Sequence, residues 1–304
     1  MIKFLAFISA FCVLLFLVFF KTSCFEDHSL FYISGENLHE IAKKDGSFGS
    51  APAFFLIEKL PLVKKNIKTG EYEIKKEESV FSVIIKMMIG KRVIRKLTIP
   101  EGYTVQMILS ILQNNNLLFE NISTHPEEGS LLPNTYFYNF GDSKDSILQK
   151  MKNQMDKLKT KLSQINKTNM TFKDILTLAS IIEKESGNKH ELNIISSVFH
   201  NRLAINMRLQ SDPTVIYGLS NGYGKLTRKL TREDLWFKSP YNTYRNGGLP
   251  PTPICCPGEG AIIAAMNPMQ TDFLYFVANK KLTGHVFSKD YESHLKEVKN
   301  FRKN

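Results

Sequence analysis

Two glutamates, Glu183 and Glu185, lie at the end of an apolar helical pattern, with Lys184 between them. Apolar residues recur at helical spacing from Phe172 to Ile182, so at about 100° per residue Lys184 falls opposite the apolar stripe. The two glutamates fall on the margins of that stripe. A carboxyl group at the apolar edge of a cleft has a raised pKa and can act as a general acid near neutral pH. Spacing alone does not choose between the two glutamates, and ordinary helix-end salt bridges are the competing interpretation.

Three later segments combine Tyr, Asn, Gln, Ser and Thr with Pro and Gly. They cover residues 209–218, 241–244 and 247–254, and we expect loops there. Tyr rings and amide or hydroxyl edges suit sugar rings, which have apolar faces and polar rims. Well-ordered turns without any ligand would have the same composition. Asp212 precedes Pro213, so a helix cap is an alternative to a catalytic role for this carboxyl group.

Several other chemistries find no support in the sequence. Residues 222–225 lack the first Gly and the Ser or Thr of a phosphate-binding loop, and residues 258–260 lack the third Gly of a dinucleotide site. His190-Glu191 has no second His at the spacing of a zinc protease. Cys255 and Cys256 are adjacent, which is not the spacing of a metal-ligand pair. The sequence therefore predicts no metal and no cofactor.

The glutamates must be positioned by a region of helices and loops. Thr171 and Asp174 form a capping pair at the start of the first helix, the next helix covers about residues 190–204, and a Lys-rich helix covers 145–162. A smaller α+β pattern comes earlier. It consists of a strand after the turn at Gly70, a helix over 79–89, a strand over 93–99, a helix from Thr104 to Leu112, and a linker-like patch over 114–133.

The 304 residues suggest about two domains. Residues 4–20 are almost purely apolar, and we expect an uncleaved membrane anchor there rather than a signal peptide, with the N-terminus inside and the rest exported. The formal net charge is +11. An exported domain meets no nucleic acid, so this charge favours a solvated basic surface or anionic partners such as a membrane or a cell-wall polymer.

Several long motifs occur together in the second half of the chain. They are LASIIEKESG (178–187), VFHNRL (198–203), LQSDPTVIYGL (209–219), YNTYRNGGLPPTPI (241–254) and GHVFSKDYESH (284–294). In order and spacing they resemble the endolytic murein transglycosylases, the YceG-like family, across roughly residues 171–294. The turns GEY (70–72) and PEG (100–102) resemble that family's LysM-like subdomain. The sequence departs from the family at Cys255-Cys256, where small residues are expected, and at Thr283.

The resemblance implies a lyase that cuts glycan strands of peptidoglycan between N-acetylmuramic acid and N-acetylglucosamine, leaving 1,6-anhydromuramic ends. In lytic transglycosylases the catalytic Glu is followed by Ser or Thr. Glu185-Ser186 matches, so the resemblance assigns general acid and base to Glu185 and keeps Glu183 in reserve. Nine residues would line the glycan cleft, each with a loop-stabilising role as the alternative: Gln210, Ser211, Asp212, Thr214, Tyr217, Tyr241, Asn242, Thr243 and Tyr244.

The predicted fold class is α+β. We expect an N-terminal transmembrane helix at residues 1–24, a small LysM-like α+β module at 25–125, and a mainly helical catalytic domain with long loops at 126–304. The resemblance implies a single-pass protein of the bacterial inner (cytoplasmic) membrane with its catalytic domain on the periplasmic side. It also implies work beside penicillin-binding proteins, ending glycan elongation. The alternatives are a non-catalytic glycan-binding scaffold and a water-using muramidase with Asp212 as second carboxylate.

Overall fold

The computed structural model describes residues 29–33, 66–279, 281 and 283–302. The predicted membrane anchor at residues 4–20 lies outside these residues. In the part of the chain that is described, no helix is both long and apolar enough to cross a bilayer.

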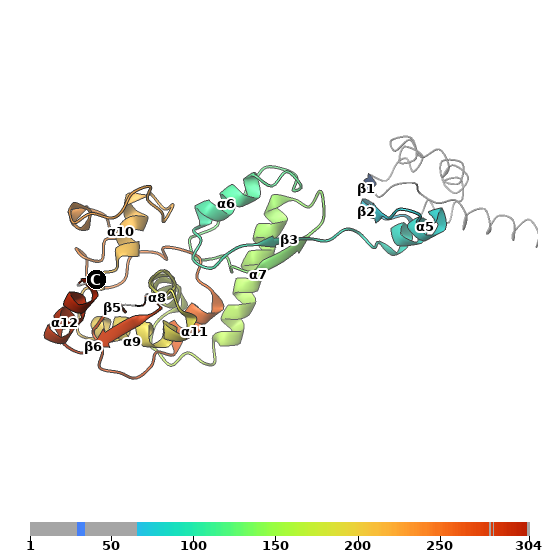
Figure 1. The fold of residues 1–304 in the computed structure, drawn as a ribbon. Coiled ribbons are helices and arrows are strands. Elements are labelled where there is room, and N and C mark those ends of the chain that lie inside the picture. The colour runs from blue at the N-terminus through green and yellow to red at the C-terminus, as the bar shows by residue number, and fades with distance from the viewer. Residues whose placement is uncertain (1–28, 34–65, 280, 282, 303–304) are drawn as a thin grey trace, which may run out of the picture. The chain divides into compact units, whose positions relative to one another are not determined.

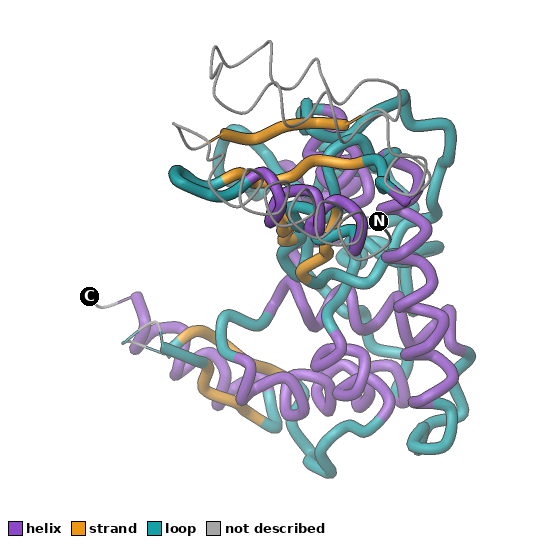
Figure 2. The backbone as a smooth tube through the Cα atoms, turned by 90° about the vertical axis from the view of Figure 1, so that its right-hand side faces the viewer, coloured by secondary structure: helices purple, strands orange, loops and turns teal. Residues whose placement is uncertain are grey.

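Helices predominate and the strands are short, as Figure 2 shows. The described strands form three two-stranded sheets, β1 with β2, β3 with β4 and β5 with β6. This mixture of helices and small sheets confirms the predicted α+β character. The strands are β1 (Ser29–Ile33), β2 (Gly70–Ile74), β3 (Arg95–Thr98), β4 (Thr135–Tyr138), β5 (Tyr275–Ala278) and β6 (His285–Ser288). The helices are α5 (Val80–Ile89), α6 (Val105–Gln113), α7 (Lys144–Leu162), α8 (Phe172–Glu185), α9 (Leu192–Ala204), α10 (Asp212–Leu219), α11 (Glu259–Met266) and α12 (Tyr291–Arg302), with short 3-10 helices at Lys189–Glu191 and Glu233–Trp236.

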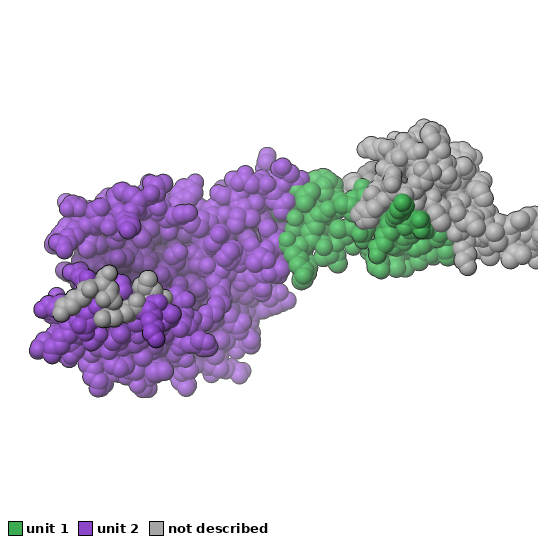
Figure 3. Space-filling model, in the orientation of Figure 1, with its two compact units in different colours: residues 1–96, 117–119, 137–142 green, residues 97–116, 120–136, 143–304 purple. Residues whose placement is uncertain are grey.

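The chain divides into two compact units, coloured separately in Figure 3. The described part of unit 1 runs up to Lys96 and includes Leu117–Phe119 and Phe137–Asp142. Unit 2 comprises Leu97–Asn116, Glu120–Tyr136 and the chain from Ser143 onward. The domain limits expected from the sequence, and the likeness of the first domain to a LysM module, stay predictions.

Unit 1 is built from the antiparallel pair β1 and β2 and from helix α5. The hydroxyl of Ser79 caps α5 by accepting from the Ser82 N–H, and Gly90 ends the helix in the left-handed conformation, with φ of 77°. These local signals explain why the sequence predicts this helix correctly. Tyr72 of β2 and Met87 of α5 are fully buried and form part of the unit's core.

Unit 2 is organised around α8, which packs against α9, α10 and α11 (Figure 1). Its core is an apolar cluster that includes Ile175, Leu178 and Ile182 of α8 and Phe199 of α9. The Lys-rich helix α7 buries one apolar face and leaves its lysines outside, as predicted. The core therefore fixes the helix that carries the two glutamates.

The segment 209–218, which the sequence predicts as a loop, is largely helical. Helix α10 begins at Asp212, and Pro213 lies in its first turn, where a missing N–H does no harm. Val215 and Tyr217 are buried on its inner face. The loop prediction is wrong because Pro also occurs in the first turn of helices, and the rest of α10 depends on the packing of its inner face. Asp212 itself lies in the first helical turn, and the cap position belongs to Ser211.

Candidate active site

The two candidate carboxyl groups lie in the last turn of α8. The helix begins at Thr171, whose hydroxyl accepts from the Asp174 N–H, and it ends before Ser186, whose N–H still donates to a helical carbonyl. Lys184 is exposed, whereas Glu183 and Glu185 are half-buried on either side of the apolar stripe. This confirms the placement expected from helical spacing.

Glu185 lines a cavity of about 310 Å³. Its Oε1 accepts a hydrogen bond of 2.6 Å from the hydroxyl of Ser211. Burial raises the pKa of Glu185 to about 7, because a desolvated carboxylate is disfavoured, and the negative charge of Asp212 adds to the rise. The Ser211 hydrogen bond and the charges of His285 and Arg202 act in the opposite direction. A carboxyl group in this state can donate a proton near neutral pH and accept it again.

Glu183 has a different environment. Its Oε2 accepts from the backbone N–H of Gly258, at 3.0 Å, and so holds the segment that leads into α11. Burial raises its pKa as well, against this hydrogen bond. Glu183 is not among the residues that line the cavity beside Glu185. The structure thus gives the two glutamates different surroundings, which helical spacing does not distinguish.

Three of the nine predicted cleft residues line the cavity with Glu185: Gln210, Asp212 and Tyr244. The hydroxyl of Tyr244 donates to Asp212 Oδ1 at 2.6 Å, which orients this second carboxylate. Gln210 has φ of 50°, a left-handed conformation that is strained for a residue with a side chain. Such strain is retained where surrounding structure enforces it, and it clusters at functional sites.

Ser211, Thr214 and Thr243 form a buried network behind the cavity. The Ser211 N–H donates to Thr243 Oγ1 at 3.0 Å, and the hydroxyls of Thr214 and Thr243 lie 2.9 Å apart. Each of the three side chains is at most 2% exposed. Ser211 connects this network to Glu185 through its hydroxyl. The network therefore holds the start of α10 against the carboxyl group.

The remaining predicted residues face other parts of unit 2. Tyr217 donates to Glu128 Oε2 at 3.2 Å, and the Tyr241 and Thr252 hydroxyls lie 2.9 Å apart. Asn242 is fully buried, and its side-chain amide donates to the backbone carbonyls of Leu235 and Phe237. None of these three residues lines the cavity beside Glu185. Their assignment to the glycan cleft stays a prediction.

Sequence reasoning did not single out several residues that line the cavity. Arg202 of α9 contributes a buried guanidinium, and Tyr275 of β5 lies beneath it. The last helix, α12, contributes Tyr291 and His294. The motifs at 198–203 and 284–294 contain three of these residues and were the available signal. Apolar residues complete the wall: Phe199, Leu209 and Phe276.

In the described chain, no three His, Cys, Asp or Glu side chains come together in a way that could hold a metal ion. Cys255 and Cys256 are free thiols and are fully buried. Burial raises the pKa of both thiols, so neither is a ready nucleophile. His285 is also held, because its Nδ1 and backbone N–H both contact the carboxylate of Glu191.

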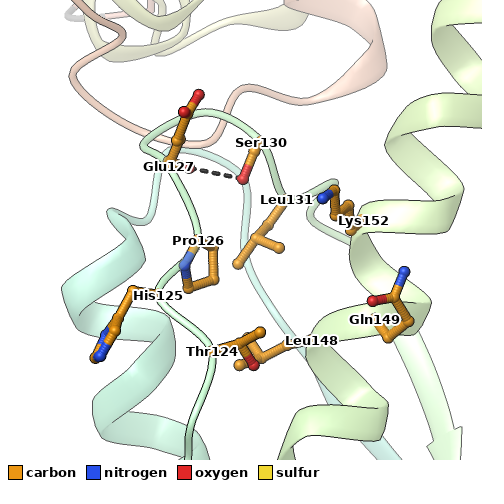
Figure 4. Close-up of a pocket in the computed structure, with 9 residues that line it drawn as sticks. All are labelled: Thr124, His125, Pro126, Glu127, Ser130, Leu131, Leu148, Gln149 and Lys152. Carbon is orange, nitrogen blue, oxygen red and sulfur yellow. Dashed lines mark hydrogen bonds between the residues drawn. The ribbon is translucent and has the colours of Figure 1, made fainter.

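A second cavity of about 370 Å³ shares no residue with the first. Figure 4 shows its walls, with Leu148, Gln149 and Lys152 coming from helix α7 and the others from a preceding loop. The Ser130 hydroxyl donates to the backbone carbonyl of Glu127 at 2.7 Å. Neither Glu183 nor Glu185 reaches this cavity.

Comparison with known proteins agrees with the motifs. The YceG-like family model matches residues 33–300. The chain is 40% identical over 185 residues to the endolytic murein transglycosylase of Bacillus subtilis, covering 60% of this chain and 49% of that protein. It is 28% identical over 281 residues to that of Streptococcus pneumoniae D39, covering 77% and 50%. The chain thus spans about half the length of these curated relatives.

A solved structure shows the same fold over most of its length. The crystal structure of a YceG-like protein from Listeria monocytogenes aligns with a TM-score of 0.57 and 34% sequence identity. The alignment covers 89% of this chain and 98% of that one.

Proposed function

This chain belongs to the YceG-like family, and from that premise we propose that it is a lytic transglycosylase acting on peptidoglycan. The observation that carries the proposal is the state of Glu185. This carboxyl group lines a cavity, accepts from Ser211, and has a pKa raised to about 7 by burial. Curated relatives named endolytic murein transglycosylase support the substrate class.

In the proposed reaction Glu185 acts twice. As an acid it protonates the glycosidic oxygen between N-acetylmuramic acid and N-acetylglucosamine, and the bond from that oxygen to muramic C1 breaks. As a carboxylate it then takes the proton from the muramic C6 hydroxyl, whose oxygen bonds to C1. The product is a 1,6-anhydromuramic end, formed without water. A pKa near neutrality suits both steps, because neither protonation state is strongly disfavoured.

The glycan would lie along the cavity that Glu185 lines. Gln210, Asp212 and Tyr244 supply amide, carboxylate and hydroxyl groups there, and the exposed ring of Tyr291 supplies an aromatic face on which a sugar ring can stack. In this proposal the other predicted cleft residues complete the cleft or fix its shape. They are Ser211, Thr214, Tyr217, Tyr241, Asn242 and Thr243.

We further propose that residues 4–20 anchor the protein in the inner membrane, with unit 2 on the periplasmic side. The support is the apolar character of that segment. An enzyme held at the membrane and cutting new strands would end glycan elongation and work beside penicillin-binding proteins. Fractionation of cells that carry the chain with and without residues 1–24 would test the anchor, since the shortened chain should leave the membrane fraction.

The activity is tested by digesting purified peptidoglycan with the chain and identifying the ends by mass spectrometry. The wild type should produce 1,6-anhydromuramic ends, and Glu185→Gln should produce none, because an amide cannot donate the proton. Glu183→Gln is the matched control, since its amide oxygen can still accept from Gly258. If Glu183→Gln alone is inactive, the reaction is right and the assigned residue is wrong. No cleavage by folded wild type that binds the polymer would point to a scaffold.

The position of Asp212 favours one second candidate, a muramidase that uses water. Asp212 lines the same cavity as Glu185, and a pair of carboxyl groups flanking the bond is what glycoside hydrolysis requires. Product mass separates the two reactions. Hydrolysis adds water and leaves reducing ends, whereas the proposed lyase does not.

A further inference from the structure

Arg202 is the only residue lining the Glu185 cavity that carries a permanent positive charge. It extends from α9 and is only 7% exposed. Its Nε donates to the Leu274 carbonyl at 2.7 Å, and its Nη1 donates to the Leu209 carbonyl at 2.6 Å. The guanidinium carbon lies 5.4 Å from the centre of the Tyr275 ring. These contacts hold the guanidinium in one orientation.

The charge of Arg202 has no direct counter-ion in the described structure. Glu185 and Asp212 line the same cavity, but neither forms an ion pair with Arg202, and Glu185 is bonded to Ser211 instead. A guanidinium has five N–H donors, and the two backbone carbonyls use two of them. Burying a charge without a partner is unfavourable. The remaining N–H donors of Arg202 are therefore suited to bind an oxygen atom of a ligand.

The neighbouring histidine does not compete for this ligand. His294 lies on the Tyr275 ring, with ring centres 5.2 Å apart in a stacked arrangement. Burial lowers the pKa of His294, and the charge of Arg202 lowers it further, so the imidazole stays neutral at neutral pH. Arg202 is thus the cation of this cavity, and its planar fork of donors matches the two oxygens of a carboxylate.

The proposed substrate offers one group of this chemistry that distinguishes its two sugars. Both sugars carry an acetamido carbonyl, but only the muramic unit carries a lactyl ether that ends in a carboxyl group, either free or joined to peptide. We propose that Arg202 is a specificity-determining residue that binds the lactyl group of the muramic unit placed beside Glu185, through both carboxylate oxygens where that group is free and through its single carbonyl oxygen where it is joined to peptide. This inference rests on the proposed function and names the feature of the substrate that the site selects.

Ligand binding to a catalytically inactive variant tests the inference without relying on turnover. The full chain with Glu185→Gln is titrated calorimetrically with three tetrasaccharides of equal length. One alternates the two sugars with free lactyl carboxylates, one has the same lactyl groups as carboxamides, and one is chitotetraose. We expect the carboxylate form to bind tightest and chitotetraose weakest, with about tenfold or more between them, the size of a charge-assisted hydrogen bond.

Adding Arg202→Gln should reduce that preference to within about threefold while chitotetraose affinity changes little, because the lost interaction is specific to the lactyl group. Arg202→Lys keeps the charge and should restore part of the preference for carboxylate over carboxamide. If the Gln variant does not fold, Arg202→Lys tests the inference in its place. Loss of the planar guanidinium should still reduce the preference for the carboxylate ligand over chitotetraose by about threefold or more.

Asn201→Ala is the matched structural control. Asn201 donates to the carbonyls of Thr271 and Phe273, in the same segment that Arg202 supports, but it does not line the cavity. This variant should lower the melting temperature and keep the ligand ranking. The inference would be overturned if Arg202→Gln weakened the binding of all three ligands equally, or if the Glu185→Gln variant bound the three ligands with equal affinity. A persistent ranking together with no anhydromuramic ends from the wild type would refute the proposed function alone.

Discussion

At the scale of single residues, the burial of Glu185 and the charges around it set the pH at which it can donate a proton. Its pKa is raised to about 7, first by burial and then by the charge of Asp212. The protonated form that starts the proposed reaction is therefore present below about pH 7 and is lost above it. Activity should accordingly fall on the alkaline side of neutrality, in a pH range set by this one group.

In the pH–activity profile, Asp212→Asn should move the fall on the alkaline side (the alkaline limb) to lower pH. The substitution removes a negative charge that favours the protonated form of Glu185. The measurement is kcat/KM against pH on soluble glycan fragments. Tyr244→Phe is the control, since it removes the hydrogen bond to Asp212 and leaves the charge in place. A limb that stays in position in Asp212→Asn would show that the two carboxyl groups are not electrostatically coupled.

Gln210 combines a strained backbone with a place on the cavity wall. Gln210→Gly should change the free energy of unfolding by no more than about 1 kcal/mol, because Gly adopts positive φ freely but loses more chain entropy on folding. The lost amide should lower kcat/KM about three- to tenfold, the size of one neutral hydrogen bond.

Asn206→Gly is the matched control for Gln210, since Asn206 also has positive φ, is exposed, and lies outside the cavity. It should leave kcat/KM unchanged. Equal activity losses in the two variants would mean that the loss comes from introducing a glycine and not from removing the Gln210 amide.

At the scale of elements, Glu128 connects two helices of unit 2. Its Oε1 accepts from the first N–H of α6, that of Val105, at 3.0 Å, and its Oε2 accepts from Tyr217 of α10. Burial raises the pKa of Glu128 to about 7. A single buried carboxyl group from the segment between α6 and β4 thus fixes the helix that follows the Ser211 network.

Glu128→Ala should lower the free energy of unfolding by about 2–3 kcal/mol, because it leaves both buried donors without an acceptor. Glu128→Gln retains one oxygen and should lose less. Urea denaturation monitored by circular dichroism measures both. Equal losses would mean that Glu128 contributes volume and not hydrogen bonding.

Which elements the sequence predicts depends on how local their causes are. Helices α5, α6 and α8 begin at Ser79, Thr104 and Thr171, whose hydroxyls cap nearby N–H groups, so a short stretch of sequence suffices. Helix α10 was missed because its inner face is stabilised by packing with other segments. The cavity was predicted only in part for the same reason. Arg202 and His294 meet there through tertiary contacts, and Thr214 and Thr243 look alike in sequence whether they face ligand or core.

At the scale of the whole molecule, the cavity depends on the last helix of the chain. Helix α12 has no buried residue, yet it supplies Tyr291 and His294 to the cavity wall. The double variant Tyr291→Ala/His294→Ala should change the free energy of unfolding by less than about 1 kcal/mol, as surface positions do. It should weaken glycan binding about tenfold or more, because stacking surface is lost.

Glu292→Ala/Lys296→Ala is the control for this helix, because it changes exposed residues of α12 that do not line the cavity. Its glycan affinity, measured by the same titration, should match that of the wild type. Equal affinity in the Tyr291/His294 variant would show that α12 is not part of the binding surface.

The raised pKa of Glu185 also has a thermodynamic consequence for folding. The unfolded chain releases this proton near the ordinary value of 4.5, whereas the folded chain keeps it to about 7. Between those values the folded state binds more protons, so the free energy of unfolding falls as the pH rises. The full difference is on the order of 3 kcal/mol. Glu185→Gln should therefore melt at a higher temperature than the wild type at pH 8 and at nearly the same temperature at pH 4, so the carboxyl group that the proposed reaction needs lowers the stability of the fold at alkaline pH.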